Sequence, residues 1–172
     1  YYFIMPMFSR IVTTIYAGLG VLIIFRGVPE DEVFHYLSVG YGWPGSLPIW
    51  VQSAIIFIVS DIILYWTHRT FHSSPLWRYH AVHHSAKHVD WHSTYRFHPV
   101  NIWLTFTLVD SIMLFCGFSL QAVTLMSIFN LLYSAMVHAN LNWTFGSFRY
   151  IFASPVFHRW HHTSQAEGVD KN

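Results

Sequence analysis

Apolar residues gather along this chain in four long stretches, separated by shorter segments that are polar or rich in Gly and Pro. A helix needs about 20 mostly apolar residues to cross the hydrocarbon core of a bilayer. Only Ser119 separates the last two stretches, so we expect a tight hairpin there. The segment Val28–Pro48, rich in Gly and Pro, is predicted to be a loop or a short re-entrant piece. The four candidate spans are Ile4–Phe25, Ile49–Trp66, Val100–Phe118 and Leu120–Val137.

This pattern predicts an all-α fold, an integral membrane bundle of about four transmembrane helices in two hairpins with a cytoplasmic histidine-rich helical cap. The composition agrees, because 10% of the residues are charged, against roughly 25% in an average soluble domain. The alternative is a soluble helical domain with very apolar core helices. We predict one domain over residues 1–172 and expect both ends to be truncated. The single cysteine, Cys116, rules out an internal disulfide.

The basic residues are distributed unevenly between the two sides of the predicted bundle. Eight of the nine fall on the side where the second and fourth helices end. Arg26 lies on the other side, countered by Glu30, Asp31 and Glu32. Positively charged residues mark the cytoplasmic side of a membrane protein, so we expect this side to be cytoplasmic. The eight residues are Arg10, Arg69, Arg78, Lys87, Arg96, Arg149, Arg159 and Lys171.

Eight of the thirteen histidines form three clusters beside the apolar stretches, all on the predicted cytoplasmic side. Helical residues at i, i+3 and i+4 share one face, so each cluster presents its imidazoles together. A closed structural zinc site uses four ligands, and eight neutral nitrogens therefore suit two metal ions with open positions. The clustered residues are His68, His72, His80, His83, His84, His158, His161 and His162.

Two further histidines are expected at the same depth as the clusters. His138 ends the fourth helix and His98 precedes the third, so either could complete a coordination shell. His35 falls on the opposite side and is interpreted as an ordinary loop residue. His88 and His92 are expected at the surface or in support of the ligands.

Polar residues within membrane spans are costly and usually functional. Asp61 lies two helical turns before His68 and is expected to orient a histidine from another cluster, since ligating imidazoles usually donate their second N–H to a carboxylate or carbonyl. Asp110 could do the same, pair with Asn130, or make a merely structural bond between helices. We also expect Asn140, two residues after His138, to support the ligands.

Taken together, these motifs resemble the fatty acid hydroxylase/sterol desaturase superfamily, and they look most like its bacterial sterol-desaturase-like members. The resemblance runs from about Ile49 to Asn172 in the order seen in that superfamily. The motifs that carry it are Asp61 to Arg69 (DIILYWTHR), Leu76 to Ser85 (LWRYHAVHHS), Phe97-His98-Pro99, His138-Ala139-Asn140 and Ser154 to His162 (SPVFHRWHH).

The resemblance implies an integral membrane non-haem di-iron oxygenase. The eight clustered histidines are then the iron ligands, with His138 and His98 as additions. The cofactor is two iron ions, which zinc can replace on purification because zinc outranks ferrous iron at nitrogen sites. The implied reaction uses O2 to hydroxylate or desaturate a C–H bond of a lipid such as a sterol or fatty acyl chain. Electrons would come from an external b-type cytochrome, or from a ferredoxin with its reductase. No nucleic-acid partner is expected.

Three other classes of protein use buried histidines. A metal-binding or transport protein could hold zinc or another divalent metal, although transporters usually place ligands near the bilayer midplane. A membrane b-type cytochrome needs paired histidines on facing helices. A metallohydrolase would carry a carboxylate within a metal motif, whereas the residue after His68 is arginine.

Overall fold

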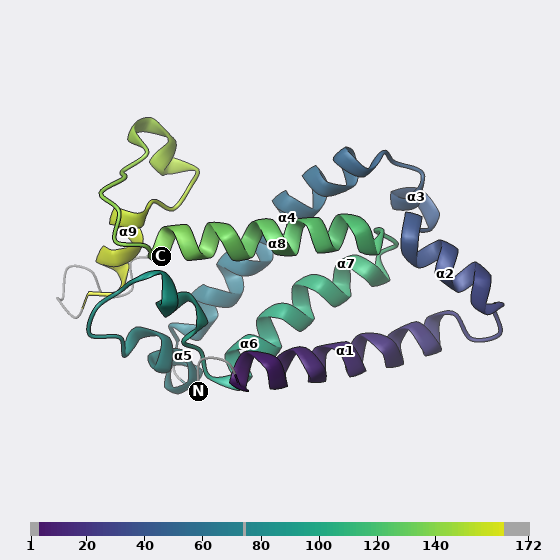
Figure 1. Cartoon of the computed structure of the whole chain (residues 1–172), viewed down its shortest axis with the longest axis horizontal. Coiled ribbons are helices and arrows are strands. Elements are labelled where there is room, and N and C mark those ends of the chain that lie inside the picture. The colour runs from purple at the N-terminus through teal and green to yellow at the C-terminus, as the bar shows by residue number, and fades with distance from the viewer. Residues whose placement is uncertain (1–3, 74, 164–172) are drawn as a thin grey trace.

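The computed structural model describes residues 4–73 and 75–163, and within these residues the secondary structure is entirely helical (Figure 1). Long helical rods run lengthwise between two end regions, with α2 and α3 at one end and α5 and α9 at the other (Figure 1). Three of the rods are single helices, α1 (Ile4–Ile24), α4 (Ile49–Phe71) and α8 (Leu120–His138). One more rod, which lies between α4 and α8 in the sequence, consists of α6 (Pro99–Phe106), the π-helical turn η2 (Thr107–Ser111) and α7 (Ile112–Phe115). The end regions contain α2 (Glu30–Val39), α3 (Gly42–Gly45), α5 (Trp77–His84), α9 (Pro155–His161) and the 3-10 turns η1 (Trp91–Tyr95) and η3 (Gly146–Tyr150).

Two of the described helices are long and apolar enough to cross a membrane. They are α4, with 23 residues, and α8, with 19 residues. Only 22% of the most apolar window of α4 and 17% of that of α8 is buried. The core helix of a soluble protein would be mostly buried, so this exposure favours the membrane interpretation. Arg10–Ile24 and Pro99–Phe115 are apolar but shorter.

The predicted third span is not one continuous α-helix. The π-helical turn η2 interrupts it and contains Asp110. The Asp110 carboxylate accepts a hydrogen bond of 3.0 Å from the hydroxyl of Ser127 on α8. Of the three roles considered for Asp110, the structure therefore shows the bond between helices, and the pairing with Asn130 was wrong.

Of the two alternatives predicted for Val28–Pro48, the loop was wrong for much of its length, because α2 occupies Glu30–Val39. Pro29 precedes the helix, and its first turn carries Glu30, Asp31 and Glu32. Negative charges stabilise the positive end of the helix dipole. These residues therefore favour a helix start despite the surrounding Gly and Pro.

The connection between α7 and α8 packs tightly on the segment that follows α2. The Tyr41 amide donates a hydrogen bond of 2.8 Å to the Gly117 carbonyl, and the Tyr41 hydroxyl donates one of 2.6 Å to that of Phe115. Gly117 has φ +97°, and a Cβ there would collide with the Tyr41 carbonyl oxygen. The side chain of Gln52, on α4, accepts a hydrogen bond of 2.9 Å from the Ser119 amide. This junction fixes the end of the molecule opposite α5 and α9.

The interior changes character along the length of the rods. Near the α7–α8 connection a small apolar core packs α4, α7 and α8 together, and it is made of Ile56, Met113, Phe118, Ala122 and Val123. At the other end the buried side chains are mostly polar, and they include His80, His83, Ser93, Thr94, Asn101, His138 and His161. A polar interior needs internal partners or ligands to be stable, so this end is the candidate site.

Candidate metal centre

Nine of the ten predicted ligands converge in two groups at the ends of α4 and α8. In each group, one potential ligand atom from every residue lies within 4.8 Å of all the others. We call them the five-histidine group and the four-histidine group. The five-histidine group contains His68, His72, His80, His84 and His161. The four-histidine group contains His83, His138, His158 and His162.

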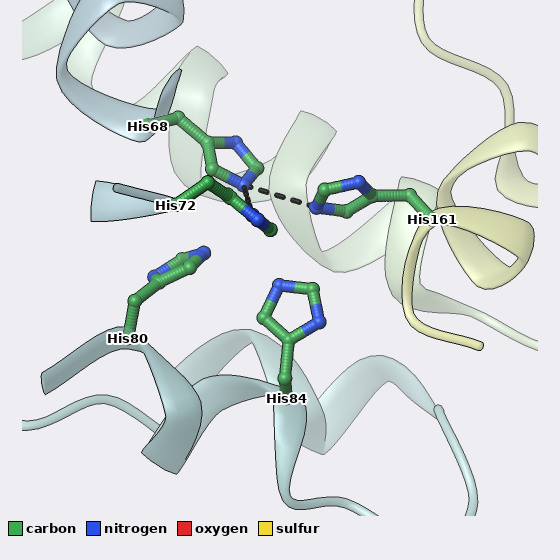
Figure 2. A group of neighbouring side chains, drawn as sticks. All are labelled: His68, His72, His80, His84 and His161. Atoms are coloured by element: carbon green, nitrogen blue, oxygen red, sulfur yellow. Dashed lines mark hydrogen bonds between the residues drawn. The ribbon is translucent and has the colours of Figure 1, made fainter. Parts of the chain in front are cut away.

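The five-histidine group collects imidazoles from three helices whose rings point toward a shared centre (Figure 2). His68 lies in the last turn of α4 and His72 caps that helix. His80 and His84 come from α5, and His161 comes from the end of α9. The Nε2 atom of His68 lies 3.0 Å from that of His72 and 3.1 Å from that of His161.

The four-histidine group has the same close spacing of nitrogens. The Nε2 atom of His138 lies 3.1 Å from that of His83 and 2.8 Å from that of His158. The Nε2 atoms of His162 and His158 are also 3.1 Å apart. With metal–nitrogen bonds of about 2.1 Å, neighbouring ligands lie about 3.0 Å apart at right angles and about 3.4 Å apart at the tetrahedral angle. These close pairs therefore match neighbouring ligands at right angles, and the other pairs in each group lie within 4.8 Å.

Two consecutive pairs of histidines link the groups. His84 and His161 face the five-histidine group, whereas His83 and His162 face the four-histidine group. The rings of His84 and His162 stack with their centroids 4.2 Å apart. Neighbouring positions on a helix point about 100° apart, so one short helix supplies both groups at once.

Hydrogen bonds fix which ring nitrogen faces the centre at two positions. His80 Nδ1 lies 2.8 Å from the side-chain oxygen of Asn101, and His138 Nδ1 lies 2.7 Å from the carbonyl oxygen of Ser134. These oxygens only accept, so each Nδ1 carries the proton and each Nε2 offers a lone pair. The buried Nε2 of His80 has no other partner within the described residues. Metal-ligating histidines are oriented in this way.

Sequence reasoning missed Asn101, which is buried on α6. Its signal was available, because it is a polar residue near the start of an apolar stretch. The side chain accepts from His80 and also lies 3.4 Å from the Thr105 hydroxyl, to which its amide can donate. Asn101 therefore performs the orienting role that the sequence analysis gave to Asp61.

Burial keeps these imidazoles neutral. It lowers the pKa of His80 to about 4, with the nearby His72 and His161 adding to the effect and the Asn101 hydrogen bond opposing it. Burial, reinforced by His138 and other neighbouring imidazoles, lowers the pKa of His162 to about 2. The pKa of His83 is lowered for the same reasons. Neutral imidazoles with free lone pairs are the form that binds metal.

Both groups border one cavity of about 450 Å³. The cavity lies among α4, α6, α8 and η1 and extends along the rods away from the histidines. His68 and His80 border it from the five-histidine group, and His83, His138 and His158 border it from the four-histidine group. Its apolar lining includes Phe57, Leu64, Ile102, Phe129 and Val137.

His98 is the predicted ligand that lies outside both groups. Its ring packs on Tyr79 at a centroid distance of 4.8 Å, and its Nδ1 accepts a hydrogen bond of 3.2 Å from the Val100 amide. The Nδ1 atom of His98 is therefore already bonded to the backbone at the start of α6. His35 is exposed on α2, and His92 is exposed and stacks on Trp91 at 3.6 Å.

The two expected supporting residues also lie apart from the imidazoles. Asp61 lines the cavity but makes no hydrogen bond to a histidine within the described residues. Asn140 is exposed just beyond the end of α8 and likewise has no such bond in this part of the chain. The structure therefore does not bring either residue to a ligand.

Comparison with known proteins places these features in context. Residues 53–172 match the family model described as fatty acid hydroxylase. Ornithine lipid hydroxylase OlsE of Rhizobium tropici is 30% identical over 128 residues, which cover 73% of this chain and 39% of that protein.

Two vertebrate relatives show a similar level of identity. The alkylglycerol monooxygenase of Danio rerio is 29% identical over 81% of this chain and 30% of its own length. The human alkylglycerol monooxygenase is 31% identical over 67% of this chain and 26% of its own length. The chain thus spans well under half the length of these relatives. No solved structure matches it significantly.

Proposed function

The chain belongs to the fatty acid hydroxylase family, as its histidine motifs predicted, and from this membership we propose that it is a membrane-bound di-iron oxygenase acting on lipids. The observation that carries the proposal is the pair of histidine groups bordering a single, mostly apolar cavity. Bound iron would supply the activation of O2 that oxidation of an unactivated C–H bond requires. Hydroxylation consumes one O2, two electrons and two protons, and it yields the alcohol and one water.

The donor set fits two iron ions. Each histidine group offers at least four ring nitrogens that lie within 4.8 Å of one another, and an iron ion that binds four or five of them would keep coordination positions open. Asn101 and Ser134 hold the rings of His80 and His138 so that Nε2 faces the ion. Zinc binds the same nitrogen ligands more tightly than ferrous iron does, so protein purified aerobically is expected to contain zinc.

The cavity is the proposed binding site for the lipid. Phe57, Leu64, Phe129 and Val137 provide an apolar wall beside the histidines that can enclose a hydrocarbon chain and exclude water. The names of the relatives specify an ornithine lipid and alkylglycerols. For this chain we infer a lipid substrate, such as a sterol or fatty acyl compound, that is hydroxylated or desaturated.

We propose that all four apolar rods enter the membrane, with the shorter Arg10–Ile24 and Pro99–Phe115 beside α4 and α8. The positive-inside rule then makes the histidine end cytoplasmic. A cytoplasmic donor, either a b-type cytochrome or a ferredoxin with its reductase, would supply electrons at this face. The predicted basic residue Lys171 lies outside the described residues. Of the others, Arg10 lies in the first half of α1 and Arg69 in the last turn of α4. The remaining five lie on or beside the short helices and turns that follow α4 and α8, and they are Arg78, Lys87, Arg96, Arg149 and Arg159.

The proposal is tested with protein expressed with added iron and kept anaerobic in detergent. Metal analysis should give two irons per chain, and Mössbauer spectra after exposure to oxygen should show a coupled pair. With a chemical reductant and isotope-labelled oxygen, lipid products should acquire one labelled oxygen atom if hydroxylated. One metal or none per folded chain, without oxidised lipid, would instead indicate a metal-binding or transport role.

A further inference from the structure

Most polar side chains that line the cavity have partners within the protein. Three of these bonds measure between 2.5 and 2.8 Å. These groups are therefore satisfied without a ligand. The pairs are Asn101 with His80, Thr94 with Ser134, and the Tyr133 hydroxyl with the Ala153 carbonyl.

Two polar side chains that line the cavity, Asp61 and Asn130, lack such partners within the described residues. Both line the cavity, Asp61 from α4 and Asn130 from α8. Neither side chain makes a hydrogen bond or ion pair within the described residues. Asp61 lies close enough to Tyr133, one turn after Asn130, for the two to interact electrostatically. The two unpartnered groups thus belong to the same part of the cavity.

Asp61 is exposed on the surface of α4 and Asn130 is half-buried on α8. In membrane-spanning helices such positions face lipid or the cavity instead of bulk water, so an unpartnered carboxyl and carboxamide are unfavourable there. A polar group moved from water to an apolar environment is destabilised unless it finds a hydrogen-bond partner, and ionisable residues in spans are usually functional. Arg10 also lines the cavity, but it interacts electrostatically with Asp110. The cavity therefore contains acceptors for a group that the protein itself does not supply.

We propose that Asp61 and Asn130 bind a hydroxyl or N–H group of the lipid and thereby determine which lipids the site accepts. This inference rests on the proposed oxygenase function. Asp61 precedes His68 by seven residues, so the two are on the order of 10 Å apart along α4. A lipid whose polar group binds Asp61 places a carbon about that far away beside the histidines. The site selects lipids with a hydrogen-bond donor at this separation from the oxidised carbon.

The test measures the binding of hexadecanol and its methyl ether to the full chain, loaded with zinc to prevent turnover and held in lipid nanodiscs. The proposal requires Asp61 to act as a carboxylate, which only accepts hydrogen bonds, so wild type should prefer the alcohol by about tenfold or more. Asp61→Asn should reduce the preference to about twofold or less, because a carboxamide can also donate to the ether. Asn130→Leu should weaken alcohol binding as well.

Asp110→Asn is the matched control, because it makes the same change at a carboxyl that already accepts from Ser127 and does not line the cavity. It should keep the wild-type preference. Unchanged zinc content shows that each variant is folded. Equal binding of alcohol and ether by wild type, or an unaltered preference in both Asp61→Asn and Asn130→Leu, would overturn the proposal. Failure of the oxygenase function would appear separately, as iron-loaded wild type that prefers the alcohol but oxidises no lipid.

Discussion

An imidazole ring has two nitrogens, and its value as a ligand depends on which one carries the proton. In His80 and His138 the proton is on Nδ1, because Asn101 and the Ser134 carbonyl accept a hydrogen bond from that atom. The sequence could identify the histidines because their spacing is local, and nine of ten proposed ligands do meet. It could mark Asn101 only as a polar residue near the start of an apolar stretch, and it could neither assign the role of Asn101 nor exclude His98, because both depend on where α6 lies relative to α5.

The ligand assignment predicts that His83→Ala and His161→Ala each lower metal content. His83 is buried in the four-histidine group and His161 in the five-histidine group, so each loss should affect one group most. Metal analysis of purified, folded protein provides the measurement. His35→Ala, at an exposed site on α2, is the control and should bind normally. Full metal content in either cluster variant would contradict the assignment.

Replacing Asn101 should weaken metal binding without removing a ligand. Asn101→Leu leaves the Nδ1 of His80 without its acceptor, so the ring loses its fixed orientation. Affinity should fall about 10–100-fold, the usual effect of losing an orienting partner. A chelator competition titration measures it. Asn140→Leu, an exposed change of the same type, should have no effect. Equal affinities for the two variants would show that Asn101 has no orienting role.

Among the elements, the interruptions are the features that hydropathy could not reveal. The apolar pattern located α4 and α8 well. It did not predict the π-helical turn η2, because the residues of η2 are of the same mostly apolar kind as those of the α-helices on either side. The same pattern failed to predict α2, because the nearby Gly and Pro residues indicated a loop although Glu30, Asp31 and Glu32 favour the start of a helix. Short helices are decided by their ends and by tertiary contacts more than by hydrophobic periodicity.

The junction between Gly117 and Tyr41 should be sensitive to a single methyl group. Gly117→Ala forces a Cβ against the Tyr41 carbonyl at φ +97°, so the free energy of unfolding should fall by about 2 kcal/mol or more. Denaturant unfolding in micelles gives this value. Gly18→Ala, on α1 with no atom within 4 Å of the added Cβ, is the control. Its stability should be unchanged or higher, since Ala favours helices. Equal stabilities would contradict the packing described at Gly117.

Considered as a whole, the molecule places neutral, buried imidazoles at one end of a bundle. The folded-state pKa values of seven of them lie below the ordinary value of 6.5, with His80 at about 4 and His162 at about 2; the other five are His68, His83, His84, His138 and His158. Between these values and pH 6.5 the unfolded chain binds more protons than the folded chain. Stability of the metal-free protein is therefore greatest above pH 6.5 and is lost as the pH falls.

The expected loss is about 1.4 kcal/mol per pH unit for each histidine that stays neutral in the fold. Denaturant midpoints of metal-free protein at about pH 7.5 and pH 5.5 measure it. A variant in which exposed His35 is replaced should lose stability in parallel with wild type. A flat profile over this range would show that the imidazoles are not held neutral by burial.

The division of the pairs His83-His84 and His161-His162 between the two groups has a thermodynamic consequence. An ion bound in either group would connect α5 to α9, because both helices contribute ligands to both groups, and it would thereby hold the backbone of the other group's ligands in place. Binding of the second ion would then cost less conformational entropy than binding of the first. This difference is a coupling free energy between the two sites. Metal uptake should consequently be cooperative, with the chain mostly empty or doubly occupied and rarely holding one ion.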